Sequence, residues 1–376
     1  MEITAGDFRL AHAGDGEWRA LVEDCIAQLA DVPSTANLGF VYVTDALDES
    51  FERIAQRLRE ATGVDDWVGT IGFGVCVGGR EYFDRPAIVA LVGTVPTDDY
   101  RLMPTLTRPG QALAGDIPDW IERRHPLLGV VHGDPRNAYI SAIIDSVCDD
   151  TSCFLVGGLT ASRGQFGQLA GTLTEGGLSG VLFADSVNVA SGLTQGCSPI
   201  GEIHEVTEAR DNVLIKLDGR PALDVFKADI GEVLARNIER IGGYIHAALP
   251  ISGTDNGDYL VRNIMGVDPT KEWMSIGERL HAGNKLMFVR RDGASALADL
   301  ERMLADVTHR AAGRPKAALY FSCVARGPNL FGDKSEEMSA VAQAIGDDVP
   351  LVGFYANGEI SNNRVYGYTG VLTLFL

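Results

Sequence analysis

The stretch Ala317-Ala-Leu-Tyr-Phe-Ser-Cys-Val-Ala-Arg326, together with the later segment Val349-Pro-Leu-Val-Gly-Phe-Tyr-Ala-Asn-Gly-Glu-Ile360, decides the fold. Both contain short apolar runs that are typical of buried strands. Between them, four apolar side chains recur at the spacing of an amphipathic helix: Met338, Val341, Ala342 and Ile345. Ser335 is placed to cap the start of this helix and Gly346 its end. The pattern therefore predicts the order strand, loop, helix, strand.

Polar residues leave the ends of both predicted strands. Cys323 and Arg326 follow the first strand, and Asn357, Gly358 and Glu359 follow the second. Parallel neighbours joined by a right-handed crossover end at the same edge of a sheet, where open α/β sheets bind ligands and a helix N-terminus favours anions. Alternatively, Arg326 and Glu359 form a salt bridge at the rim and Gly358 only makes a turn. We predict a ligand cleft lined by Cys323, Arg326, Gly353, Asn357, Gly358 and Glu359.

The same unit occurs twice more in the chain, beginning near Leu38 and near Leu127. Each copy closes on a strand that contains Val-Gly: Val68-Gly69, Val156-Gly157 and Val352-Gly353. A glycine inside a strand marks a bulge or a close approach by backbone or ligand, and the sequence leaves both reasons open. Strand ends of the middle copy supply the secondary candidates for ligand binding: His132, Gly157, Gly158 and Arg163. A lone histidine at a strand end is more often structural.

The order strand–helix–strand–helix–strand runs from Phe8 to Phe73 and again from Leu286 to Tyr355. Gly78-Gly79 reads as a hairpin turn, so the sheets are expected to be mixed. These patterns predict an α/β (α+β mixed) fold with two related domains, mixed sheets and repeated strand–helix–strand units. The turn at Asp218-Gly-Arg-Pro221 is the best candidate for a boundary. It divides the chain into residues 1–218 and 219–376.

The composition is that of a soluble globular protein, with 45% hydrophobic and 22% charged residues among 376. The chain has neither an apolar run long enough to span a bilayer nor a signal peptide, so we expect a cytoplasmic protein without membrane insertion. A net charge of −19 argues against nucleic acid as a partner, because phosphate binding needs a basic surface.

No motif in the sequence supports catalysis or cofactor chemistry. The six cysteines form no Cys-x-x-Cys pair, and the histidines have no metal-ligand spacing, so neither a zinc site nor a disulfide framework is expected. A P-loop, a dinucleotide fingerprint and a nucleophile elbow are also missing. Cys323 is the one candidate nucleophile, because a cation such as Arg326 lowers the pKa of a neighbouring thiol. Such an enzyme would need a base, which the sequence does not indicate.

Five segments together resemble the FIST proteins, named from F-box and intracellular signal transduction. They are Phe321-Ser-Cys-Val-Ala-Arg326, Val352-Gly-Phe-Tyr-Ala-Asn-Gly-Glu-Ile360, Gln195-Gly-Cys-Ser-Pro-Ile-Gly-Glu202, Leu217-Asp-Gly-Arg-Pro-Ala-Leu-Asp-Val225 and Val156-Gly-Gly-Leu-Thr160. The resemblance implies a FIST N-terminal domain over residues 1–218 and a FIST C-terminal domain over 219–376. It also implies a sensory module for a small ligand, amino acids being the usual proposal.

Neither an F-box-like leader nor an output domain is recognised in this chain, so we expect the signal to pass to a separate partner protein. Some FIST proteins resemble haem-containing nitric oxide sensors; haem is therefore an alternative, although no axial histidine can be matched here. In the favoured interpretation Arg326 holds a carboxylate or another anion, Glu359 holds an ammonium group and Asn357 orients the ligand. The sequence indicates neither the ligand nor the oligomeric state.

Overall fold

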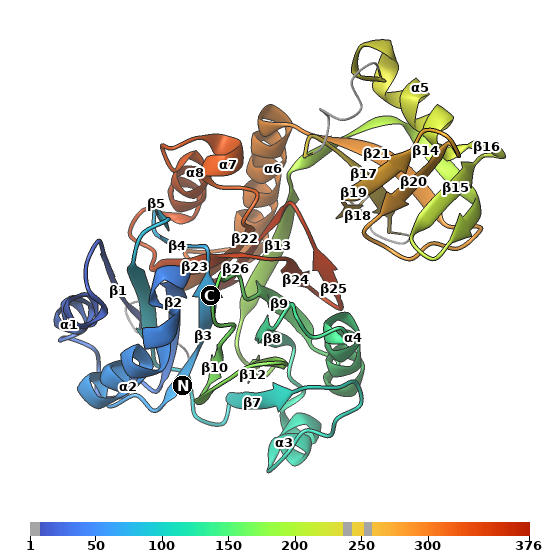
Figure 1. Cartoon of the computed structure of the whole chain (residues 1–376). Helices are drawn as coiled ribbons and strands as arrows, with labels where there is room; N and C mark the ends of the chain where they lie inside the picture. Colours follow the sequence, from blue (N-terminus) through green and yellow to red (C-terminus); the bar gives the residue numbers. More distant parts are fainter. Residues whose placement is uncertain (1–7, 236–242, 252–257) are drawn as a thin grey trace. The chain divides into compact units, whose positions relative to one another are not determined.

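The computed structural model describes residues 8–235, 243–251 and 258–376, and the chain divides into two compact units (Figure 1). Unit 1 comprises Met1–Thr194 and Leu300–Leu376, and unit 2 comprises Gln195–Asp299. The predicted class is confirmed, because helices alternate with strands and the sheets mix parallel and antiparallel pairs. The predicted boundary after residue 218 lies within unit 2. The division of the FIST N and FIST C domains at this point stays a prediction.

Unit 1 contains the three predicted strand–helix–strand repeats. Repeat 1 is β2 (Leu38–Thr44), α2 (Phe51–Thr62) and β3 (Asp66–Gly72). Repeat 2 is β8 (Leu128–Gly133), α4 (Ile140–Thr151) and β9 (Phe154–Leu159). Repeat 3 is β22 (Ala317–Cys323), α8 (Glu336–Ile345) and β23 (Leu351–Ala356). The two strands of each repeat are parallel neighbours. Ser335 and Gly346 flank α8 at the predicted positions, but the Ser335 side chain makes no capping hydrogen bond, which corrects its predicted role.

Each repeat lies at the centre of a six-stranded sheet with the same arrangement. An outer strand comes first, then an antiparallel strand, the parallel pair and a hairpin. In repeat order the outer strands are β1 (Phe8–Gly14), β7 (Tyr100–Leu106) and β13 (Val189–Gln195). The next strands are β6 (Ala87–Gly93), β12 (Leu178–Phe183) and β26 (Thr369–Phe375). Unit 1 is therefore a threefold repeat of one sheet.

The hairpins are exchanged between the repeats. The hairpin β4 (Gly74–Val77) and β5 (Arg80–Phe83) follows repeat 1 but completes the sheet of repeat 3. The hairpin β10 (Gln168–Ala170) and β11 (Thr172–Thr174) follows repeat 2 and completes the sheet of repeat 1. The hairpin β24 (Glu359–Ser361) and β25 (Arg364–Tyr366) follows repeat 3 and completes the sheet of repeat 2. Each repeat thus donates a hairpin to another in a closed cycle.

The three Val-Gly glycines have a packing reason. Gly69, Gly157 and Gly353 face Val41, Val131 and Tyr320 on the parallel partner strands. A Cβ added to these glycines would lie 1.7, 1.9 and 1.6 Å from the carbonyl oxygen of that partner. The close approach of a neighbouring strand therefore explains all three glycines, and Gly157 and Gly353 need no ligand to account for them.

The inner faces of the three sheets share one apolar core, with members such as Phe40 from repeat 1, Val130 from repeat 2 and Phe321 from repeat 3. Helices cover the outer faces of the sheets. α1 (Trp18–Gln28) and α2 pack on the sheet of repeat 1, and α3 (Ile117–Arg124) and α4 pack on that of repeat 2. No helix among the described residues is long and apolar enough to cross a membrane.

Unit 2 interrupts unit 1 between β13 and β22, and it includes the first part of the helix α6 (Gly293–Ala311). Its long strand β14 (Cys197–Arg210) pairs with β21 (Lys285–Arg291), and α5 (Ala222–Ala235) packs on this antiparallel sheet. The remaining strands are β15 (Val213–Leu217), β16 (Arg220–Pro221), β17 (Ile245–Pro250), β18 (Tyr259–Arg262), β19 (Ile264–Asp268) and β20 (Trp273–Ile276).

The pairing of β21 corrects one expectation. The second five-element order, from Leu286 to Tyr355, does not form one sheet, because β21 pairs with β14 and β17 instead of joining β22. Unit 2 also holds a cluster in which the buried His204 lies 2.6 Å from the exposed Asp218 and 2.8 Å from the partly buried Asp229.

Candidate functional site

A buried carboxylate organises the carboxyl end of β22. Glu337, in the first turn of α8, has a fully buried side chain. It accepts hydrogen bonds from the Tyr320 hydroxyl at 2.7 Å, the Ser322 hydroxyl at 3.1 Å and the Arg326 Nε at 2.7 Å. The backbone N–H of Gly327 adds a fourth bond at 3.0 Å. We expected the N-terminus of α8 to bind an anion. In the structure, the carboxylate of Glu337 in the first turn of α8 already lies there.

The other two repeats have no such network in this position. The register that aligns Gly69, Gly157 and Gly353 places Val41 and Val131 at the position of Tyr320. Two residues further along, Val43 and Gly133 correspond to Ser322. Those two repeats pack this layer with apolar side chains. The repeated fold therefore does not require buried charge here, and the polar network is a property of repeat 3 alone.

Arg326 lies at the inner end of this network. Its guanidinium is fully buried, and its Nη1 and Nη2 have no hydrogen-bond partner. Phe331, in the short helix α7 (Pro328–Phe331), places its ring 5.1 Å from the guanidinium carbon. Because a buried charged donor without a partner is costly, these two nitrogens mark a place where a polar group can bind.

Glu359 is the counterpart of Arg326. Its Oε2 accepts bonds from the Thr369 hydroxyl at 2.7 Å and the Thr369 N–H at 3.2 Å, whereas the buried Oε1 has no partner. Burial raises the pKa of Glu359 to about 8, although hydrogen bonds from Thr369 and the charge of Arg326 act in the opposite direction. No ion pair joins the two side chains, which nevertheless lie within electrostatic range. At neutral pH, Glu359 is therefore mainly protonated.

Cys323 belongs to the same cluster, because its thiol lies within hydrogen-bonding reach of the Glu359 carboxyl. It is 7% exposed, and burial raises its pKa, with the negative charge of Glu359 adding to the effect. A protonated thiol is the opposite of what a nucleophilic cysteine needs. The positive charge of Arg326 does lower the pKa of Cys323, as expected, but burial raises this pKa by more.

The structure thus brings Cys323, Arg326 and Glu359 together; of the other predicted site residues, some lie next to Glu359 and Arg163 lies elsewhere. Asn357 is exposed, and Gly358 has a φ of +127°, a conformation that favours glycine. Gly158 pairs with Glu359 across the exchanged hairpin of repeat 3. Arg163 lies at a different edge, where it pairs with Asp45 at 2.7 Å and Asp84 at 2.9 Å.

His132 lies at the centre of unit 1. Tyr42, His132 and Phe321 occupy equivalent positions in the three repeats, and their ring centroids are 5.4 to 6.2 Å apart. Burial lowers the pKa of His132 to about 3, so the ring is neutral. Its Nε2 lies 3.2 Å from the Tyr42 hydroxyl. The histidine is a core residue of the threefold centre. No cluster of three His, Cys, Asp or Glu side chains able to hold a metal ion occurs among the described residues.

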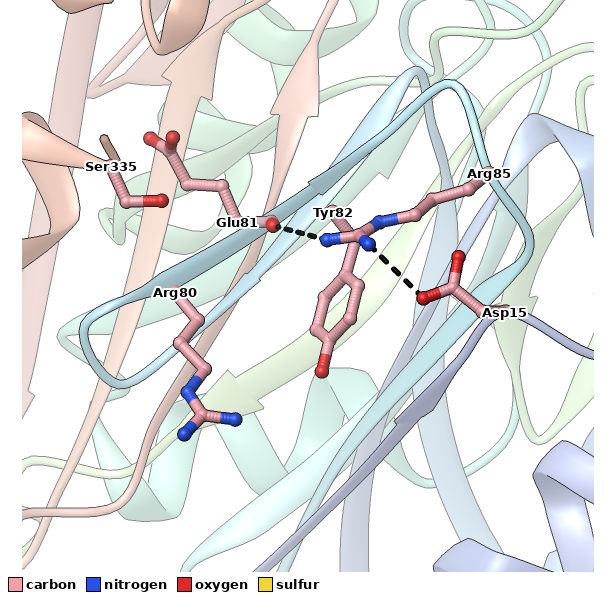
Figure 2. A pocket seen from close by; sticks show the side chains of 6 residues that line it. All are labelled: Asp15, Arg80, Glu81, Tyr82, Arg85 and Ser335. Atoms are coloured by element: carbon pink, nitrogen blue, oxygen red, sulfur yellow. Dashed lines mark hydrogen bonds and ion pairs between the residues drawn. The ribbon is translucent and has the colours of Figure 1, made fainter. Parts of the chain in front are cut away.

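A cavity of about 380 Å³ lies at the β4–β5 hairpin, and no motif of the sequence indicated it (Figure 2). It is lined by Asp15, Arg80, Glu81, Tyr82, Arg85 and Ser335. The hairpin turn was recognisable, but its docking onto β23 was not, because the two segments are far apart in the chain.

Glu81 connects this cavity with the buried network. Its carboxylate accepts a hydrogen bond from the Tyr355 hydroxyl, and in Figure 2 it points toward Ser335. The pKa of Glu81 is raised to about 7, mainly by burial and also by the negative charge of Glu337. The hydrogen bond from Tyr355 lowers the pKa and offsets part of this rise. Tyr355 also touches the position of Gly327, where an added Cβ would lie 2.8 Å from the tyrosine ring. A hydrogen bond from Glu81 to Tyr355 and the packing of the Tyr355 ring against Gly327 therefore link the cavity wall to the residue next to Arg326.

Comparison with known proteins identifies relatives along most of the chain. The model of the FIST N domain matches residues 37–220, and that of the FIST C domain matches residues 222–362. An uncharacterized protein of Mycobacterium tuberculosis is 31% identical over 329 residues, covering 82% of this chain and 83% of the relative. An uncharacterized protein of Mycobacterium bovis is 29% identical over 326 residues, covering 82% of each chain.

Proposed function

Because this chain belongs to the FIST family, whose domains are associated with sensory roles in signal transduction, we propose that it senses a small ligand at the buried cluster of repeat 3. The cluster consists of Arg326, Glu359 and Cys323, with Glu337 holding the guanidinium in place. Asn357 and Gly358, immediately before Glu359, form its outer edge.

One observation carries the proposal: two buried groups of opposite charge type, Arg326 and Glu359, lie within electrostatic range of each other and both have unused hydrogen-bonding capacity. Arg326 Nη1 and Nη2 are donors without acceptors, and Glu359 Oε1 is equally without a partner. Both side chains are fully buried, with relative exposures of 0%. A ligand with an acceptor for Arg326 and a donor for Glu359 would satisfy both groups at once.

An α-amino acid has this pair of groups, and we propose it as the ligand class. Its carboxylate would accept from Arg326, and its ammonium group would donate to Glu359. Since Glu359 is mainly protonated at pH 7, an ammonium group that binds there would displace a proton to solvent. Binding would therefore release close to one proton at pH 7, and less at pH 9, where Glu359 is already ionised.

Isothermal titration calorimetry of an amino-acid panel at pH 7, in two buffers of different ionisation enthalpy, measures this proton release. Glu359→Gln should weaken binding and abolish the proton release, because the side chain keeps its shape and loses its ionisable group. Glu336→Gln makes the same change on the exposed side of α8 and is the matched control. An amino acid that binds the Glu359→Gln variant as tightly as the wild type would refute this assignment.

We also propose that the occupied state is read by a separate protein partner in the cytoplasm. Support comes from the signalling association of the family. α8 provides a route, since it bears Glu337 on its buried side and Ser335 at the cavity. Co-purification from cell lysate with and without the bound amino acid tests this; a partner set that does not change with ligand would contradict it.

A further inference from the structure

The cavity at the β4–β5 hairpin is distinct from the buried cluster, since none of its six lining residues belongs to that cluster. Asp15 follows β1, and Arg80, Glu81 and Tyr82 lie on β5. Arg85 lies between β5 and β6, and Ser335 precedes α8. The site therefore exists only because the hairpin of repeat 1 docks on the sheet of repeat 3.

Most polar groups of the cavity are already occupied. Arg85 pairs with Asp15 at 3.0 Å and donates to the backbone carbonyl of Glu81 at 3.4 Å. Its guanidinium also lies 4.8 Å above the ring of Tyr82. The Tyr82 hydroxyl lies 2.6 Å from His12 Nδ1. The Glu81 carboxylate accepts from Tyr355.

Arg80 differs from the other lining residues. Its side chain makes no hydrogen bond or ion pair with any residue that the structure describes. Figure 2 shows its guanidinium apart from the Arg85–Asp15 pair. The positive charge of Arg80 still influences its neighbour His12. Burial is the main cause that lowers the pKa of His12, and the charge of Arg80 lowers it further. With Arg85 neutralised by Asp15, the cavity retains one uncompensated positive charge while Glu81 is protonated.

From this arrangement we propose that the cavity is a second ligand site, which binds a small organic monocarboxylate through Arg80. The carboxylate would take paired N–H donors from the Arg80 guanidinium, the geometry in which arginine binds carboxylates best. The Ser335 hydroxyl, which also lines the cavity and interacts with Glu81, supplies a further polar contact for the body of the ligand. The volume of about 380 Å³ lies within the range of small-molecule sites.

The charge balance selects a monoanion over a phosphate. One free guanidinium faces one negative charge, whereas a dianion would also have to lie beside Glu81 and Asp15. The groups that face Glu81 are Tyr355 from β23, Ser335 and Glu337 from α8 and Cys76 from β4, with Arg80 and Arg85 on the cavity side. Since the pKa of Glu81 is about 7, its ionisation adds a repulsive charge as the pH rises. Carboxylate affinity should therefore be higher at pH 6 than at pH 8.

Ligand-observed NMR and calorimetry at pH 6 test the site with acetate, propionate, lactate and benzoate, with their primary amides, and with inorganic phosphate. We expect at least one carboxylate to bind. Its amide should bind at least about tenfold more weakly, because it cannot form the charge-assisted hydrogen bond. Phosphate that binds more tightly than every carboxylate would overturn the ligand class. Absence of carboxylate binding at 10 mM would overturn the site.

Three variants locate the binding. Arg80→Gln should reduce carboxylate affinity by about tenfold or more, and folding should survive because Arg80 is exposed and unpaired with the described residues. Arg108→Gln, an equal charge change on an exposed loop of unit 1, should leave affinity within twofold. Arg326→Met/Glu337→Met, which removes the buried guanidinium together with its counter-charge, should also leave it within twofold. Unchanged affinity in Arg80→Gln overturns the proposal, as does loss of binding in the double variant, which would assign the carboxylate to Arg326 instead.

Discussion

Replacing Glu359 with glutamine should change how the stability of unit 1 depends on pH. Glu359 has a pKa of about 8 in the folded protein and 4.5 as a free side chain. The folded state therefore holds a proton on this group between those two values, which the unfolded state releases, so rising pH destabilises the fold. Below pH 4.5 both states are protonated and the penalty vanishes; above pH 8 it is complete. Glutamine has no such proton.

Integration of this difference in proton binding from pH 5 to pH 8 gives a loss of about 3.5 kcal/mol in the wild type relative to Glu359→Gln. With an m-value near 3 kcal/mol/M, the urea midpoints of the two proteins should separate by roughly 1 M over that range. The variant should be the more stable protein at pH 8, because it no longer ionises a fully buried group beside Cys323.

Tryptophan fluorescence can report on unit 1 alone. Trp18, Trp67 and Trp120 lie in unit 1, and Trp273 is the fourth tryptophan, so a Trp273→Phe background removes the signal of unit 2. Urea unfolding would be followed at pH 5, 6, 7 and 8 in this background, with and without Glu359→Gln. Glu336→Gln serves as the exposed control and should follow the wild type. Parallel stability curves for the wild type and Glu359→Gln would refute the reasoning, because they would mean that Glu359 ionises as freely in the fold as in the unfolded chain.

Four further outcomes follow from the structure. Glu337→Gln leaves the buried Arg326 without its counter-charge and should lower the free energy of unfolding by about 3 to 5 kcal/mol. The double variant Arg326→Met/Glu337→Met removes both charges and should lower it much less. Urea midpoints measure both changes. Gly353→Ala places a Cβ 1.6 Å from a carbonyl oxygen and should abolish soluble expression, whereas Gly313→Ala, whose Cβ meets no atom closer than 4.0 Å, should match the wild type in yield and Tm. Iodoacetamide at pH 7.5 should modify Cys323 more slowly than free cysteine in the native protein and at a similar rate in urea, by peptide mass spectrometry; faster native labelling would revive the nucleophile hypothesis. Burial alone would lower the pKa of His204, but hydrogen bonds to two aspartates raise it overall. The stability that protonated His204 contributes to unit 2 is therefore present below about pH 6.5 and is lost as the pH rises through the raised pKa. Unfolding followed by Trp273 fluorescence should depend less on pH in His204→Gln.

Local pattern was sufficient to predict the repeated units. Helical spacing located α8 with its flanking Ser335 and Gly346, and the Val-Gly pairs marked equivalent places in three strands. These features are readable because a helix or strand shows its period within a few residues of chain. Parallel strand ends also predicted that Cys323, Arg326 and Glu359 lie close together, which the structure shows.

The depth of that cluster was not readable from the same pattern. Glutamates in the first turn of a helix normally face solvent near the helix dipole, and Glu337 precedes the apolar stripe of α8 by one residue. Its burial depends on Tyr320, Ser322 and Arg326, whose polar atoms come together only when α8 packs on β22. The guanidinium of Arg326 accordingly lies in a buried ion pair with Glu337, which the sequence did not indicate; that a ligand binds there stays a prediction.

By itself, then, the sequence determined the class of fold, the three strand–helix–strand repeats and the family. Tertiary structure alone decided the exchange of hairpins, the insertion of unit 2 between β13 and β22, and the cavity lined by Arg80 and Ser335. The reason is that side-chain periodicity is a local property, whereas the choice of a strand's partner depends on contacts between distant residues. Tyr355 and Glu81, whose hydrogen bond joins the two sites, are 274 residues apart in the chain.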